Sequence, residues 1–310
     1  MFMKYNVDIK KSERFELQRR VVSYKTSESW KNIPHITYIY EPDITDFYEE
    51  FLKLSKERAT KGFNITFNTI MIKVIIEGLL SAPYLNSYLE YNHKKVEGII
   101  HILAEINVSI PWLLKDGRMI TPTICNCKGL SINDISRYIS NIKSRIEKTN
   151  INELLYRATF TDTVNELKNL NLSILRRIIA AKLTKYKING LKGKEKKEYY
   201  NLTENERLTE KDLMCGTVTV SNIGPLYKEQ KGFFGLLEII LPQVFAIGIG
   251  SVQEKPGVYL NLDGKKEIGI RKILPMCLAF DHRAVDFNSV IPFIKRLDEV
   301  FENPKVIHNW

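Results

Sequence analysis

The sequence predicts an α/β fold, a two-layer sandwich in which helices cover a mixed β-sheet. Helix and strand patterns alternate in the first half of the chain, and strand patterns dominate from residue 215 onward. The segment 67–80 is apolar almost all round, as is typical of a helix buried against a sheet. We expect a single domain over residues 1–310, with an N-terminal arm at about 1–33 and a basic helical insertion at about 151–209.

The elements of the first half follow from periodicity and turn residues. Residues 34–41 alternate and are rich in β-branched and aromatic types, which predicts a strand. Asp43 is the expected N-cap of a helix that runs to about residue 59. We then expect a helix at 67–80, a long strand at 96–110, a turn at Lys115-Asp116-Gly117, a strand at 119–124 that completes a hairpin, and an amphipathic helix at 131–147.

The second half is expected to consist mainly of strands. An alternation of hydroxyl residues and valines predicts a strand at 215–222, and an apolar run predicts another at 243–252. Two further strands flank the Asp263-Gly264 turn. A buried strand at 273–280 then leads to His282, and a helix is predicted at 289–301.

Composition and charge exclude several classes of function. No apolar run approaches the roughly 20 residues that span a bilayer, and no spacing of His, Cys and Asp indicates a metal site. The four cysteines form no CxxC pair, so we expect reduced thiols in the cytoplasm. Residues 176–197 carry nine of the Lys and Arg against one acid; they could attract phosphates, but we favour a solvated insertion and expect no nucleic-acid partner.

His282 is the candidate general base. Imidazole titrates near neutrality, so it can take a proton from a hydroxyl or thiol, and Asp286 follows four residues later. This spacing by itself is weak, and on the pattern alone a core histidine at a strand end is the commoner explanation. Thr217, Thr219 and Ser221 share one face of a strand, where a hydroxyl could donate a hydrogen bond to an oxyanion; the alternative is a threonine-rich surface strand.

Six segments occur together in an order that resembles a known family. They are Pro34-His35-Ile36-Thr37, the helix that ends Ala82-Pro83-Tyr84-Leu85-Asn86, residues 106–124, Gly216-Thr217-Val218-Thr219-Val220-Ser221-Asn222-Ile223-Gly224, Leu241-Pro242-Gln243-Val244 through Gly250, and Asp281-His282-Arg283-Ala284-Val285-Asp286. Together they cover most of residues 12–304. The chain resembles the catalytic domain of the dihydrolipoyl acyltransferases of 2-oxoacid dehydrogenase complexes, relatives of chloramphenicol acetyltransferase.

The resemblance implies a role for each matching residue. His282 matches the general base, and Asp286 matches the acid that holds the loop, often by pairing with an N-terminal arginine; Arg20 is the candidate partner, with Arg19 close behind. Ser221 matches the hydroxyl that supports the oxyanion, with Thr219 and Asn222 as supporting residues. The family forms trimers with the active site between neighbours, so His282 and Ser221 could come from different chains.

The sequence departs from the family pattern in three places. Phe287 follows Asp286 where the family has glycine, and a backbone that needs a positive φ would be strained by phenylalanine. We expect a stand-alone form without a lipoyl domain. The segment 151–209 is longer than the ordinary domain needs, and its residues 170–177 resemble stand-alone relatives.

The expected function is that of a cytoplasmic stand-alone acyltransferase. It would move an acyl group from a thioester, on coenzyme A or a carrier-protein phosphopantetheine, to a hydroxyl or thiol acceptor in biosynthetic tailoring. We expect no tightly bound cofactor, a homotrimer or multiple of trimers, and an acyl carrier protein or lipoyl domain as partner. The alternatives are the dihydrolipoyl acyltransferase core of a 2-oxoacid dehydrogenase complex, with the lipoyl domain in trans, and a catalytically inactive trimeric scaffold.

Overall fold

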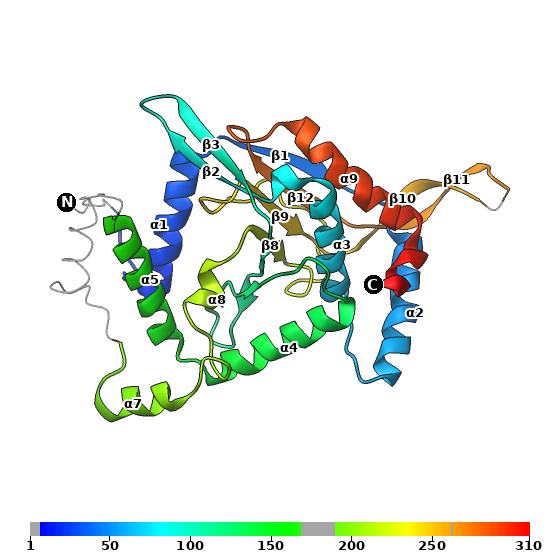
Figure 1. Ribbon diagram of the computed structural model, residues 1–310. Coiled ribbons are helices and arrows are strands. Elements are labelled where there is room, and N and C mark those ends of the chain that lie inside the picture. Colours follow the sequence, from blue (N-terminus) through cyan, green and yellow to red (C-terminus); the bar gives the residue numbers. More distant parts are fainter. Residues whose placement is uncertain (1–6, 169–189, 262) are drawn as a thin grey trace.

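The computed structural model describes residues 7–168, 190–261 and 263–310, with the backbone alone for 160–168. It confirms the predicted fold class: a six-stranded sheet with helices packed on it (Figure 1). β8 runs parallel to both β9 and β4, whereas the other neighbours are antiparallel, so the sheet is mixed. In spatial order its strands are β1 (His35–Tyr40), β12 (Met276–Asp281), β9 (Phe245–Ile249), β8 (Val218–Asn222), β4 (Val108–Ser109) and β7 (Thr123–Ile124).

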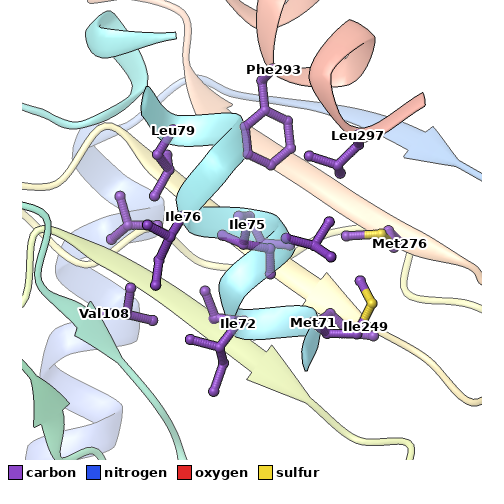
Figure 2. Packing of buried hydrophobic residues seen from close by; sticks show 14 of the residues in the cluster. Met71, Ile72, Ile75, Ile76, Leu79, Val108, Ile249, Met276, Phe293 and Leu297 are labelled. Carbon is purple, nitrogen blue, oxygen red and sulfur yellow. The ribbon is translucent and has the colours of Figure 1, made fainter. Parts of the chain in front are cut away.

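Helix α3 (Phe67–Ser81) connects the sheet to the helical layer, as its apolar composition predicted. Its residues from Thr69 to Ile76 are all buried. Figure 2 shows α3 side chains in one cluster with Ile249 and Met276 of the sheet and with Phe293 and Leu297 of α9 (Phe287–Glu302). Burial of each such side chain stabilises the fold by about 1.5–3 kcal/mol.

The helix starts are set by local hydrogen bonds. Ser131 and Asp134 form a capping box at the start of α4 (Ile132–Lys148), in agreement with the predicted helix. The predicted cap of α2 (Thr45–Thr60) is wrong by one residue, because the N-cap position is held by Ile44. Asp43 instead accepts from the backbone N–H of Thr45 at 3.0 Å and pairs with Arg271 on the neighbouring hairpin.

The long strand predicted at 96–110 is wrong. The chain forms β3 (Glu97–Ile102), bends, and enters the central sheet only at β4. The amide of Asn86 holds this bend by donating to the carbonyls of Leu103 and Glu105, at 3.1 and 2.9 Å. β3 pairs with β2 (Ser87–Asn92), a strand that the sequence pattern did not reveal, and this hairpin extends away from the body (Figure 1).

Two further hairpins match the predicted turns. β5 (Trp112–Leu113) pairs with β6 (Met119–Ile120) around Gly117, whose φ of 81° requires glycine. β10 (Gln253–Leu260) pairs with β11 (Lys266–Ile273), and this hairpin lies on the side of the molecule away from α1, at the right of Figure 1.

The segment predicted as an insertion is helical where the structure describes it. α5 (Ile151–Lys168) packs beside α1 (Leu17–Asn32), which lies within the predicted N-terminal arm (Figure 1). The buried carboxylate of Glu153 on α5 accepts hydrogen bonds from Leu191 N and Tyr200 Oη at 2.8 and 2.7 Å, which ties α7 (Gly193–Asn201) to α5. A short helix, α8 (Lys211–Met214), leads back to the sheet. Residues 170–177 and most of the basic stretch lie outside the described residues, so the boundaries of the insertion stay a prediction.

Two short 3₁₀ segments each follow a helix, and the described part of the chain contains no membrane-spanning helix. η1 (Pro83–Leu85) follows α3, and η2 (Pro304–Asn309) follows α9. None of the described helices is both long and apolar enough to cross a bilayer.

Candidate active site

His282 lies directly after β12, where the sequence pattern placed it. Its backbone N–H donates to the carbonyl of Pro34 at 3.2 Å, and the preceding Asp281 N–H donates to Val244 at 2.9 Å. The carbonyl of Asp281 then accepts from the N–H groups of Ala284 and Val285, both at 3.0 Å, which closes a tight turn. The backbone on both sides of the imidazole is therefore held by hydrogen bonds, while the His282 side chain is exposed in the single chain.

The imidazole of His282 is held in one tautomer. Its Nδ1 lies 3.2 Å from the carbonyl oxygen of Val285, which can only accept a hydrogen bond. Nδ1 therefore carries the proton in this contact, and Nε2 presents its lone pair. No hydrogen bond to Nε2 is present in the described part of the chain, so the nitrogen that would act as the base is open.

A buried ion pair fixes the same loop, and sequence reasoning missed it. Asp281 is fully buried, and its carboxylate accepts from Arg283 Nε at 3.0 Å and from Arg283 Nη2 at 2.6 Å. The guanidinium also lies over the ring of Tyr91, 5.2 Å from its centroid, which joins the loop to the β2–β3 hairpin. The only sequence signal was an acid at the end of a buried strand with an arginine two residues later.

Asp286 serves as the N-cap of α9. Its side chain accepts from Ser289 N at 3.4 Å, and no ion pair joins it to Arg20 of α1 within the described chain. The pairing of these two residues, and the alternative with Arg19, stay predictions. The prediction that Phe287 strains the backbone is wrong, because this residue begins α9 and does not have a positive φ. Its ring packs on Tyr38, with the centroids 5.0 Å apart.

Ser221, Thr219 and Asn222 all lie on β8, as predicted. The Thr219 hydroxyl donates to Gln243 Oε1 at 2.8 Å, and Asn222 closes a turn by accepting from Gly224 N at 2.9 Å. Asn222 also donates to Asn68 Oδ1 at 3.0 Å. The half-buried Ser221 hydroxyl makes no hydrogen bond to any described residue, so it is free to donate to a ligand.

The strand register separates Ser221 from His282 within one chain. Ser221 is level with Gly248 of β9, and Gly248 is level with Cys277 of β12. Four further residues lead from Cys277 to Asp281, a distance of about 14 Å along the strand, and His282 lies beyond. The two side chains are also two strands apart, roughly 10 Å across the sheet. A hydroxyl and an imidazole this far apart cannot act on the same carbonyl.

A second histidine near the loop is structural. His35 faces Asp281 across β1 and β12, donates through Nδ1 to Ile33 O at 2.9 Å, and accepts at Nε2 from Ile239 N at 3.2 Å. Both ring nitrogens are occupied, and burial lowers the pKa of the imidazole. We therefore assign no catalytic role to His35. Among the described residues, no group of three His, Cys, Asp or Glu side chains could hold a metal ion.

Comparison with known proteins gives one family. The family model described as 2-oxoacid dehydrogenases acyltransferase (catalytic domain) matches residues 8–163 and 184–308, and the gap lies inside the predicted insertion. Over 86% of its length the chain is 24% identical to the dihydrolipoyllysine-residue acetyltransferase component of the pyruvate dehydrogenase complex of Corynebacterium glutamicum. It is also 22% identical, over 92% of its length, to the lipoamide acyltransferase component of the branched-chain alpha-keto acid dehydrogenase complex of Bacillus subtilis. The chain spans only 30% of the length of the first relative and 50% of the length of the second.

Solved structures show the same fold. A probable dihydrolipoamide acetyltransferase from Listeria monocytogenes superposes with a TM-score of 0.61 at 20% identity, covering 95% of both chains. The dihydrolipoamide acetyltransferase of Azotobacter vinelandii superposes with a TM-score of 0.63 at 17% identity, covering 98% of this chain and 99% of that one.

Proposed function

Because the chain belongs to the family of 2-oxoacid dehydrogenase acyltransferase catalytic domains, we propose that it transfers an acyl group between two thiols. One thiol is that of coenzyme A, and the other is that of a dihydrolipoyl group on a lipoyl domain. Curated relatives named as acyltransferase components of dehydrogenase complexes support this alternative over the expected biosynthetic tailoring of a hydroxyl or thiol acceptor.

The observation that carries the proposal is the fixed tautomer of His282. With Nδ1–H donating to the Val285 carbonyl, Nε2 can take the proton of an incoming thiol. The thiolate then attacks the thioester carbonyl and forms a tetrahedral oxyanion. When the intermediate collapses, the second thiolate leaves and receives the proton back from Nε2. Atoms and charges balance without any further reactant.

The oxyanion needs a donor that the His282 loop does not supply. Ser221 carries a free hydroxyl, but the sheet register places it far from His282 in the same chain. We infer that the two side chains meet across a subunit contact of a trimer, His282 from one copy and Ser221 from the next. In the Azotobacter vinelandii enzyme, a serine, a histidine and an asparagine have been studied for their role in the catalytic mechanism. The asparagine follows the histidine by four residues there, as Asp286 follows His282 here.

The same proposal includes the assembly. One solved relative is the cubic core of a pyruvate dehydrogenase complex, which supports trimers that associate further. The corresponding partner is a lipoyl domain; a phosphopantetheine carrier and the cytoplasmic location remain predictions from the sequence. The inactive-scaffold alternative loses its main argument, because Phe287 causes no backbone strain.

An acceptor assay tests the function. The purified protein is incubated with acetyl-coenzyme A and either free dihydrolipoamide or a panel of hydroxyl acceptors, and products are identified by mass. We expect S-acetyldihydrolipoamide and coenzyme A, with no ester from the hydroxyl panel. Transfer to hydroxyl acceptors alone would restore the tailoring function. No transfer to either class by an intact oligomer would favour the scaffold.

A further inference from the structure

Two free cysteines that are far apart in the sequence lie side by side in the fold. The Sγ atoms of Cys125 and Cys215 are 2.9 Å apart, although 90 residues separate them along the chain. Cys125 follows β7, and Cys215 ends α8 just before β8. Both side chains are only half-buried, so a small molecule can reach them.

A buried asparagine holds the two backbone segments together. Asn107 precedes β4 and is 7% exposed. Its Nδ2 donates to the carbonyl of Cys215 at 3.0 Å, and its Oδ1 accepts from the N–H of Asn126, the residue after Cys125, at 2.7 Å. The approach of the two sulfurs is therefore fixed by the fold and does not depend on the side chains alone.

The surroundings make the two thiols chemically unequal. Either thiol can donate in this contact; with Cys125 as the donor, its S–H stabilises the Cys215 thiolate, which lowers the pKa of Cys215 to about 7 and raises the pKa of Cys125. Thr123 also donates to Cys215, whereas the nearby carboxylate of Asp212 opposes ionisation of both thiols and Tyr138 contacts Cys125. The pair therefore holds a thiolate beside a thiol near neutral pH, which is the arrangement that a peroxide-reactive pair needs.

We propose that Cys125 and Cys215 are an oxidation site at which a hydroperoxide produces an intramolecular disulfide. The Cys215 thiolate attacks one peroxide oxygen, the O–O bond breaks, and the other oxygen leaves as water after taking a proton. The resulting sulfenic acid is attacked by the Cys125 sulfur; the S–O bond breaks, and its oxygen leaves with the Cys125 proton as a second water. Two thiols lose two electrons, and one hydrogen peroxide becomes two waters.

The geometry requires little movement. A disulfide needs the sulfurs at about 2.0 Å, so the pair must approach by roughly 0.9 Å from its present separation. The other two cysteines serve as internal controls because both are buried. Burial raises the pKa of Cys127 to about 12 and that of Cys277 to about 11. The Cys127 thiol also donates to the carbonyl of Ile124 at 3.1 Å.

Peptide mapping after oxidation tests the proposal, which does not depend on the acyltransferase function. The reduced full-length chain is treated with hydrogen peroxide, blocked with iodoacetamide and analysed by mass spectrometry. We expect a loss of about 2 Da, a cross-linked peptide pair containing Cys125 and Cys215, and reversal by dithiothreitol. Cys127 and Cys277 should remain alkylatable after denaturation. Two results would overturn the proposal. One is that Cys125 and Cys215 stay free at a peroxide dose that oxidises methionines. The other is a disulfide that links other cysteines or two chains.

Two variants assign the roles. In Cys125→Ser, a dimedone adduct should form on Cys215, because its sulfenic acid has no thiol to resolve it. In Cys215→Ser, Cys125 should stay free at the same dose, and Cys277→Ser should form the disulfide as the wild type does. The opposite pattern would contradict the assignment of Cys215 as the attacking thiol. In that pattern the dimedone adduct forms on Cys125 of Cys215→Ser and not on Cys215 of Cys125→Ser.

Discussion

Ser221 and His282 lie near opposite ends of the central sheet along the direction of its strands, although β8 and β12 are both neighbours of β9. Parallel pairing of β8 with β9 and antiparallel pairing of β9 with β12 bring the end of β8 level with the start of β12. If both residues serve one reaction, they must come from two chains.

Subunit mixing tests this directly. His282→Ala and Ser221→Ala chains should each be nearly inactive alone, but a mixed assembly should regain activity. Random mixing of equal amounts leaves about one site in four with both residues intact. The measurement is acetyl transfer to dihydrolipoamide before and after the two variants are dissociated and reassembled together. Mixed oligomers with no gain in activity would contradict a site shared between subunits.

The His282→Ala variant should lose activity without losing its fold. General-base assistance contributes about 10²–10⁴ in rate, so we expect a loss of kcat of that order. Ser221→Ala should reduce kcat by about 10²–10³ if Ser221 donates to the oxyanion. The matched control is His308→Ala: this histidine pairs with Glu50 at 2.8 Å, away from the candidate site, and its removal should leave kcat unchanged. Equal losses in both histidine variants would point to a folding defect.

Removal of the Asp281 carboxylate should affect both stability and activity. Asp281 is fully buried against Arg283, so Asp281→Ala leaves a largely buried guanidinium without its partner and should cost about 3 kcal/mol of unfolding free energy. The released loop should also move the imidazole and lower kcat by up to about 10². Urea unfolding and steady-state kinetics measure the two effects. Asp116→Ala, which breaks an exposed pair with Arg118, should change neither appreciably.

Gly78→Ala should disturb the packing of α3 on α9. A Cβ at Gly78 would lie 2.6 Å from Leu297 Cδ1 and 2.7 Å from the ring of Phe293, both in the cluster of Figure 2. Overpacking of this kind costs about 1–3 kcal/mol, which chemical unfolding can detect. Gly232→Ala is the control, since a Cβ there meets nothing within 4 Å. A Gly78→Ala protein as stable as the control would mean that α9 moves away more easily than the close contacts indicate.

The rate of alkylation of Cys215 should rise with pH at a lower pH than that of an ordinary thiol, whose pKa is about 8.5. Its pKa is lowered to about 7, so the reactive thiolate is a minor species at pH 6 and predominates above pH 8. The rate of reaction with iodoacetamide should therefore rise with a midpoint near pH 7, as followed by peptide mass spectrometry. In Cys125→Ala, which removes the donor to the Cys215 sulfur, the midpoint should move upward. A wild-type midpoint near pH 9 would show that Cys125 does not stabilise the thiolate.

The elements that the sequence predicted well share a periodic pattern or a local cap. The apolar surface of α3, the capping box of α4 and the alternation of β1 each depend on residues within a few positions of one another. The position of His282 after a buried strand followed from the same local information.

The errors arose where a distant residue decides the local structure. The chain from residue 96 to 110 has the alternation of one strand, but the amide of Asn86 binds two of its carbonyls and bends it. Phe287 was expected to be strained by comparison with a glycine pattern, yet Asp286 caps a helix that begins at that residue.

By itself the sequence determined the fold class, the strand that delivers His282 and the presence of a hydroxyl on β8, because side-chain periodicity reports which face of an element is buried. Tertiary structure alone decided which residues meet: Arg283 closing on the buried Asp281, Ser221 lying at the far end of the sheet from His282, and Cys125 touching Cys215. Such contacts depend on strand order and register, which are set by packing of the whole chain and leave no spacing in the sequence from which they could be read.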